Sequence, residues 1–184
     1  MKSIDTMVKE HENIKRMSKV MRKYCYKVLT CKEVDYEDFY KIIDFVRNYS
    51  DGHHHAKEED VLFKRLGEEI PKLGNEGAIT GMLIEHDLSR LYIANLEASL
   101  DDYKNGNDEA RLDIIANAIS YTDLLERHIE KENNALYKFA NTMLTEKAKK
   151  EIDEKCNEID KKAEEMGNIT KYTSLLEELE SKLK

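Results

Sequence analysis

The amino-acid sequence predicts an all-α protein: an antiparallel up-down four-helix bundle with an extra helical appendage at its C-terminal end. Three observations lead to this prediction. The 184 residues include one proline and seven glycines, and 37% of them are charged, a profile typical of helices joined by few turns. Apolar residues recur at alternating steps of three and four along four long segments. These segments have similar lengths and brief connections, as in an antiparallel bundle.

The first helix is expected over about residues 3–30, where the apolar stripe that should face the bundle includes His11. A second helix is expected over about Asp35–Ile70, with its first residue as the N-terminal cap. It contains the run His53-His54-His55. Gly52 stands just before this run and indicates a kink or a close backbone approach.

The clearest break in the chain is expected over residues 67–77, which contain a proline and several glycines. A third helix is then expected over about 78–104. The sequence Asn-Gly-Asn-Asp at 105–108 is a stop-and-cap signal. A fourth helix should follow, to about residue 143. Residues 1–143 are therefore predicted to form one domain.

The last 40 residues carry no copy of the pattern described below. Thr145 is expected to cap a charged helix that ends near Glu165, and Gly167-Asn168 should separate it from a final helix over 170–184. Residues 144–184 are called the C-terminal extension here. We expect it to pack on the bundle, to form a homodimer contact, or to dock a protein partner.

Two segments of the chain repeat each other 74 residues apart, residues 54–64 and residues 128–138. A shorter similarity relates residues 10–16 to residues 85–90. The unit of a helix with one histidine, followed by a helix with His-x-x-x-Glu, therefore occurs twice. A histidine and a glutamate four residues apart lie on one face of a helix.

Together the two copies supply four imidazoles and two carboxylates near the inner stripes of four helices. Burying such groups without partners costs several kcal/mol, and a pair of divalent cations would remove that cost. We therefore predict a metal site. The donor types favour iron, then manganese, then zinc. The predicted ligands are His11, His54, Glu58, His86, His128 and Glu132.

Three adjacent histidines, residues 53–55, compete for one ligand position. His53 is followed four residues later by Lys57, which cannot bind a metal ion, so it is expected to face solvent. His55 is followed at the same spacing by Glu59, so this pair is a rival to the one chosen above. The alignment with the second copy favours His54 and Glu58 as the ligands. Whether His55 and Glu59 also bind the metal stays open.

Acidic residues flank two of the predicted ligands by one position, about 100° around the helix. They are expected to be solvated charges, although one is a candidate to orient an imidazole. They are Glu10, Glu12, Glu85 and Asp87. Neither His86 nor His128 has an acid three residues before it, which disfavours a ferritin-like ferroxidase.

These motifs make the chain resemble the hemerythrin-like, or HHE cation-binding, family over about residues 3–143. The resemblance rests on His11, on the segment from His54 to Phe63, on residues 82–87 and on the His128/Glu132 pair. It implies a non-haem di-iron centre inside the bundle, with an oxo or hydroxo bridge between the two ions and with manganese or zinc less favoured.

By the same resemblance, Glu58 and Glu132 would bridge the ions. The remaining ligands would divide between them, with His11 and His54 on one iron and His86 and His128 on the other.

Two positions depart from the oxygen-carrying hemerythrins. Those proteins place a further histidine four residues after the helix-three histidine, where this chain has Arg90. They also have an aspartate five residues after the last histidine, whereas this chain has Glu132 at four. The site therefore resembles the four-His, two-Glu bacterial branch, which includes iron–sulfur-cluster repair proteins and proteins that respond to peroxide or nitric oxide.

The expected function is a di-iron protein that reacts with or senses O₂, NO or peroxide in oxidative or nitrosative stress. The alternatives are an iron donor or iron–sulfur-cluster repair factor that acts through a protein partner, and a purely structural bundle. Whether the protein is an enzyme stays open. The formal net charge of −8 argues against nucleic-acid and anionic-membrane partners.

The sequence also predicts a soluble, cytoplasmic protein. No apolar run approaches the roughly 20 residues needed to cross a bilayer, and the first ten residues lack the apolar core of a signal peptide. The three cysteines include no Cys-x-x-Cys pair, which disfavours zinc-ribbon and thioredoxin-like sites.

Overall fold

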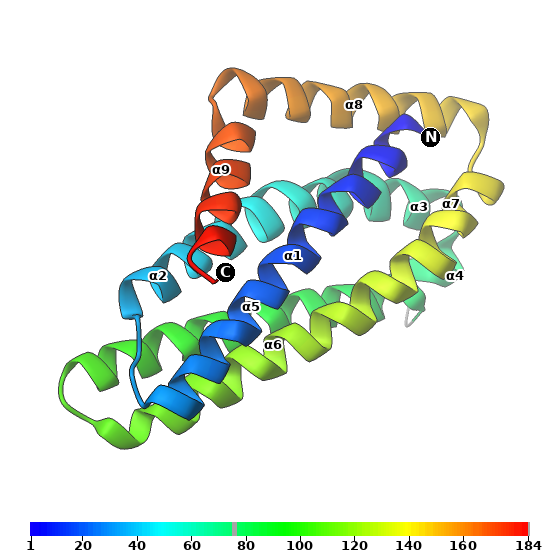
Figure 1. Cartoon of the computed structure of the whole chain (residues 1–184). Coiled ribbons are helices and arrows are strands. Elements are labelled where there is room, and N and C mark those ends of the chain that lie inside the picture. The colour runs from blue at the N-terminus through cyan, green and yellow to red at the C-terminus, as the bar shows by residue number, and fades with distance from the viewer. Residues whose placement is uncertain (75–76, 184) are drawn as a thin grey trace.

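The computed structural model describes residues 1–74 and 77–183, and within these ranges every regular element is helical. Four long helical rods run antiparallel in the order up, down, up, down (Figure 1). The first rod is α1 (Lys2–Cys31) and the third is α5 (Ala78–Lys104). The second comprises α2 (Tyr36–Phe45), η1 (Val46–His55), η2 (Glu58–Phe63) and α3 (Lys64–Glu69). The fourth comprises η3 (Asp108–Ala110), α6 (Arg111–Lys131), η4 (Glu132–Leu136) and α7 (Tyr137–Met143). The all-α bundle predicted from the sequence is confirmed.

The ends of these rods follow the local signals in the sequence. The carboxylate of Asp35 accepts a hydrogen bond from the backbone N–H of Asp38 at 3.2 Å, so it caps α2 as expected. Asn107 caps η3 in the same way, after Gly106 at φ +99°. The short helix α4 (Pro71–Gly74) lies within the expected break. Residues 75 and 76 of that break, and residue 184 of the expected last helix, lie outside the described residues.

The second rod departs from a regular α-helix where it carries its histidines. η1, η2 and, on the fourth rod, η4 are π-helical, with wider turns than an α-helix. Gly52 lies inside η1, and a Cβ added there would come within 3.0 Å of the Arg47 carbonyl oxygen. This glycine therefore marks a close backbone approach, one of the two outcomes expected from the sequence. π-Helical turns are frequent at functional sites.

Two apolar clusters occupy the two ends of the bundle. On each rod, the histidines and glutamates lie at the boundary between one cluster and the other. On α1, for example, Ile4 and Met7 belong to one cluster and Ile14 and Met17 to the other, with His11 between them. The polar site is therefore enclosed by apolar layers along the bundle axis.

The C-terminal extension contributes to both clusters. Thr145 caps α8 (Glu146–Glu165), and Gly167 at φ +72° separates it from α9 (Asn168–Ser181), as expected. α8 crosses one side of the bundle near the N-terminus, and α9 returns along α1 and α2 (Figure 1). The side chains that α8 buries in one cluster are Ala148, Ile152 and Cys156, and those that α9 buries in the other are Tyr172, Leu176 and Leu179.

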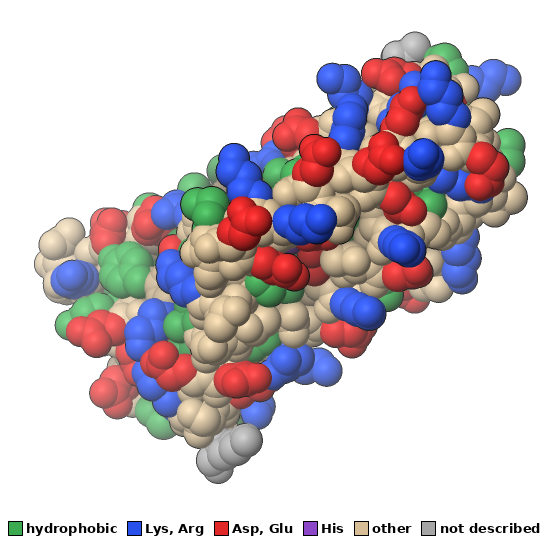
Figure 2. Space-filling view, turned by 90° about the horizontal axis from the view of Figure 1, so that it is seen from above, with side chains coloured by type: hydrophobic (Ala, Val, Ile, Leu, Met, Phe, Trp, Pro, Cys, Tyr) green, Lys and Arg blue, Asp and Glu red, His purple; other side chains and the backbone are tan. Residues whose placement is uncertain are grey.

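The surface carries charges of both signs. Figure 2 looks onto the molecule from above the view of Figure 1 and shows basic and acidic side chains interspersed, with small apolar patches between them. Within residues 1–74 and 77–183, no helix is both long enough and apolar enough to cross a membrane.

Candidate metal centre

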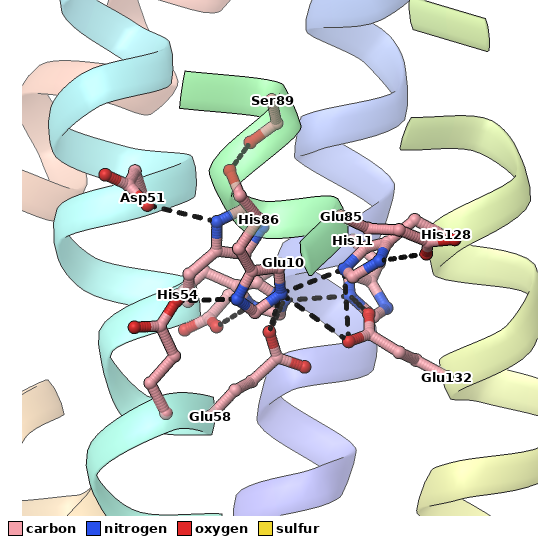
Figure 3. A network of polar contacts seen from close by, with 12 residues as sticks. Glu10, His11, Asp51, His54, Glu58, Glu85, His86, Ser89, His128 and Glu132 are labelled. Atoms are coloured by element: carbon pink, nitrogen blue, oxygen red, sulfur yellow. Dashed lines mark hydrogen bonds and ion pairs between the residues drawn. The ribbon is translucent and has the colours of Figure 1, made fainter. Parts of the chain in front are cut away.

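The six residues predicted as metal ligands meet at the centre of the bundle. One comes from α1, two from the second rod, one from α5 and two from the fourth rod (Figure 3). Each is at most 2% exposed. The structure therefore brings together every site residue that the sequence proposed, and the assignment of these residues as ligands remains a prediction.

Four of these residues form a first ligand group, in which one donor atom from each lies within 4.8 Å of the others: His11, His54, Glu58 and Glu132. The Nε2 atoms of His11 and His54 are 2.8 Å apart. Nε2 of His11 lies 3.3 Å from Oε2 of Glu132, and Nε2 of His54 lies 3.6 Å from Oε2 of Glu58. These four atoms surround one position at which a cation could bind.

A second ligand group lies beside the first and consists of His55, Glu58, His86 and His128. The Nε2 atoms of His86 and His128 are 3.1 Å apart. Oε2 of Glu58 lies 3.5 Å from Nε2 of His86, so this carboxylate belongs to both groups. Glu132 also reaches the second group, with Oε1 at 3.1 Å from Nε2 of His128. The two carboxylates thus lie between two clusters of imidazoles.

The hydrogen-bonding state of the two carboxylates shows that the site fits cations. Oε2 of Glu58 and both oxygens of Glu132 are buried and make no hydrogen bond with the described residues. Such orphaned oxygens are costly in a protein interior. Only Oε1 of Glu58 has a donor, the hydroxyl of Tyr137 at 2.5 Å. A pair of divalent cations would supply the missing partners, and nitrogen and carboxylate donors together are suited to transition metals.

Burial favours the neutral form, which a metal requires, in two of the predicted ligands, His54 and His86. It lowers the pKa of His54 to about 3, helped by the neighbouring His11. Burial together with His55 and His128 also lowers the pKa of His86. The pKa of His128 is raised, because Glu132 and Glu85 outweigh the effect of burial. A neutral imidazole is the form that binds a metal ion, so His54 and His86 are ready to bind near neutral pH.

Burial acts in the opposite direction on a carboxyl group. Together with the nearby Glu132 it raises the pKa of Glu58 well above its usual range. His128 and His11 hold the pKa of Glu132 low in spite of its burial. One of the two neighbouring carboxyl groups is thus favoured in its neutral form and the other in its charged form, as expected for acids that share a site.

Each of the five imidazoles in the two ligand groups has an oxygen atom within hydrogen-bond distance of its Nδ1. The residues and distances are Asn133 for His11 at 3.0 Å, Glu10 for His54 at 2.8 Å, Asp51 for His55 at 3.2 Å, Glu59 for His86 at 2.7 Å and Glu85 for His128 at 2.9 Å. An acceptor at Nδ1 places the proton on that nitrogen and directs Nε2 to the metal side.

The acidic residues that flank His11 and His86 differ in whether their side chains are buried or exposed. These residues were expected to be solvated, with one of them a candidate to orient an imidazole. Glu10 is 6% exposed, and both Glu10 and Glu85 contact imidazoles. Glu12 and Asp87 are exposed, as expected. Glu10 and Glu85 face inward because antiparallel packing places each of them beside a histidine of the neighbouring rod. The sequence pattern of a single helix does not reveal such a contact.

The prediction that His53 faces solvent is wrong. This side chain is 7% exposed, and its Nε2 lies 3.1 Å from Oε1 of Glu10 and 3.4 Å from Oδ1 of Asp160. Lys57, which argued for exposure, is itself fully buried. The reason is that α8 of the C-terminal extension covers this side of the second rod.

His55 is the candidate that the sequence left undecided. It is 2% exposed and its ring stacks on that of His86, with centroids 3.8 Å apart. Arg90 stands where oxygen-carrying hemerythrins have a histidine, and it pairs with Asp51 and Glu59, the acceptors for His55 and His86. The His55-x-x-x-Glu59 spacing already indicated that His55 could be a ligand. The alignment of the two repeated segments nevertheless favoured His54 and Glu58.

Comparison with known proteins agrees with this site. The model of the hemerythrin HHE cation-binding domain family matches residues 2–140. No curated protein and no solved structure gives a significant match. The family model spans most of the chain and includes all five histidines and both glutamates of the two ligand groups. This chain belongs to the hemerythrin HHE cation-binding family.

Proposed function

We propose that this protein holds two iron ions in the bundle and reacts with, or senses, O₂, NO or peroxide. The observation that carries the proposal is the position of Glu58, whose buried Oε2 has no hydrogen-bond donor and lies near both ligand groups. A donor set of imidazoles and carboxylates without thiolate favours iron in a two-metal site.

The ligands divide naturally between the two positions. His11 and His54 would hold one ion, and His86, His128 and His55 the other. Glu58 and Glu132 lie between the two groups and would bridge them. When bound, a pair of iron ions supplies the electrons that small oxidants accept.

The protein side chains prepare this centre and protect it. The apolar clusters at both ends of the bundle keep bulk water away, and the Nδ1 acceptors hold the imidazoles in one orientation. In this proposal residues 1–143 carry the metal centre, and residues 144–184 cover one of its sides. A buried site of this kind favours reagents of diatomic or peroxide size.

The proposal is tested by adding ferrous iron to the metal-free protein without oxygen, followed by elemental analysis. We expect about two irons per chain, and charge-transfer absorption in the near ultraviolet after addition of air or hydrogen peroxide. NO should change the spectrum of the ferrous protein.

A matched pair of variants makes this test specific. Glu58→Gln removes the carboxylate shared by both ligand groups and should reduce binding to one iron or none. Glu59→Gln alters the adjacent residue, which contacts only Nδ1 of His86 among the histidines, and should keep both irons with affinity reduced about 10–100-fold. A protein that binds no iron contradicts the proposal. One that binds two irons but reacts with none of the three reagents supports the iron-donor alternative.

A further inference from the structure

A second polar cluster lies against the metal centre, on the side covered by α8. It consists of Glu10 from α1, His53 and Lys57 from the second rod, and Asp160 from α8, and we call it the Lys57 cluster. The Lys57 side chain is 0% exposed, whereas the Asp160 side chain is 23% exposed. The cluster therefore extends from the centre of the bundle to the C-terminal extension.

Lys57 is the cation of this cluster. Its Nζ lies 2.5 Å from Oε1 of Glu10 and 2.6 Å from Oδ1 of Asp160. Nε2 of His53 lies near the same two oxygens. A buried ammonium group persists only where carboxylates compensate its charge. Here two carboxylates do so, one from the bundle and one from the extension.

Among the described residues, Glu10 is the member of the cluster whose side chain hydrogen-bonds to a predicted metal ligand. While Oε1 of Glu10 pairs with Lys57, its Oε2 accepts a hydrogen bond from Nδ1 of His54 at 2.8 Å. Those contacts, with His53, lower the pKa of Glu10 despite its burial, so this carboxylate is charged. A continuous chain of polar contacts thus runs from Asp160 through Lys57 and Glu10 to a predicted metal ligand.

We propose that Asp160 of the C-terminal extension is a positioning residue of the metal centre, acting through Lys57 and Glu10 on His54. An ammonium group has three donors. Without Asp160, Lys57 would take both oxygens of Glu10 and draw Oε2 away from the imidazole. His54 would then lose the acceptor that keeps its proton on Nδ1 and its Nε2 directed to the first ligand group. This inference rests on the proposed metal centre.

The test compares two aspartates of the same helix. Asp160→Asn removes the charge that faces Lys57. Asp153→Asn is the matched control, because Asp153 accepts hydrogen bonds from Ser3 at 2.9 and 2.6 Å and so anchors α8 to α1 without touching the Lys57 cluster. Titration of the metal-free proteins with Co²⁺ should show affinity about 10–100-fold lower for Asp160→Asn and unchanged for Asp153→Asn.

A second measurement uses the metal-free protein and does not depend on metal binding. In protein labelled with ¹⁵N-histidine, the Nδ1–H resonance of His54, identified by its absence in His54→Gln, reports the bond to Glu10. We expect it to shift or disappear in Asp160→Asn and to remain in Asp153→Asn. If the wild-type protein binds no Co²⁺ and no iron, the proposed function fails, while this measurement still decides the role of Asp160.

A double variant separates positioning from stability. Lys57→Met with Asp160→Leu removes both charges, a change that buried pairs often tolerate. Glu10 then keeps its contacts with His54 and His53. We expect the His54 resonance and the Co²⁺ affinity to return to within a few-fold of wild type. Equal effects of Asp160→Asn and Asp153→Asn, or loss of the His54 resonance in the double variant, would overturn the proposal.

Discussion

The hydroxyl of Tyr137 donates a hydrogen bond to Oε1 of Glu58 across 2.5 Å, between the first turn of α7 and the second rod. The same ring stacks on His11, with centroids 5.6 Å apart and an interplanar angle of 5°. Burial and the carboxylate of Glu58 raise the pKa of Tyr137 well above its usual range, so the hydroxyl keeps its proton. Tyr137 therefore orients Glu58, the carboxylate that both ligand groups share.

Tyr137→Phe should destabilise the metal-free protein. The change leaves Oε1 of Glu58 buried without a donor, which costs about 1–3 kcal/mol of unfolding free energy. Urea denaturation of the metal-free protein measures this loss. Tyr26→Phe is the control, because Tyr26 is 66% exposed and surface changes usually stay within about 0.5 kcal/mol. Equal losses in the two variants would show that the buried hydrogen bond contributes nothing specific.

His55→Ala and His53→Ala should separate the roles of the two histidines that flank His54. His55 belongs to the second ligand group, whereas His53 contacts only Glu10 and Asp160 among the acidic residues near it. We expect His55→Ala to lower the metal content measured by elemental analysis from about two ions per chain to about one. His53→Ala should retain about two. The opposite ranking would mean that the ligand groups are assigned wrongly.

Acidification should destabilise the metal-free protein. The pKa of His54 is 6.5 when unfolded and about 3 in the folded protein, so between these values the unfolded chain binds more protons. Stability is therefore lost as pH falls from 6.5 towards 3. For His54 alone, the loss between pH 7 and 5 is about 2 kcal/mol. The pKa values of His55 and His86 are also lowered, which adds to the loss, whereas the raised pKa values of His53, His128 and Glu58 oppose it.

Urea unfolding at pH 7 and pH 5 measures this effect, and His54→Gln provides the comparison because it cannot take up the proton. The variant should lose less stability over this pH range than the wild-type protein. Identical pH dependence would contradict the low pKa of His54. Metal should also leave the loaded protein at acid pH, since ligating histidines must be neutral, and retention at about pH 4 would contradict histidine ligation.

Gly52→Ala and Gly81→Ala should have opposite effects on stability. A Cβ at position 52 would come within 3.0 Å of the Arg47 carbonyl oxygen in the π-helical turn, whereas nothing lies within 4 Å of a Cβ at position 81. We expect Gly81→Ala to stabilise the protein by about 0.4–1 kcal/mol. Gly52→Ala should destabilise it and disturb the adjacent histidines. Thermal unfolding and metal content measure the two effects, and stabilisation by both variants would show that the π-helical turn accommodates a side chain.

Much of the fold was predictable because its signals are local. The caps at Asp35 and Thr145 and the glycines near positions 106 and 167 end or begin helices through contacts within a few residues. The sequence also predicted, for the same reason, that His11 and His86 lie in apolar stripes. The period of an α-helix decides which residues share a face, whatever packs against it.

The sequence by itself thus determined the four rods and the six residues that meet between them. Only the tertiary structure decided which neighbours of those residues belong to the centre. The second rod is π-helical where it carries His53, His54 and His55, and all three side chains are buried, His53 beneath α8. Antiparallel packing turns Glu10 and Glu85 towards histidines of adjacent rods, and α8 brings Asp160 to Lys57 across 103 residues of sequence. These contacts join residues far apart in the chain, and no periodicity within one helix encodes them.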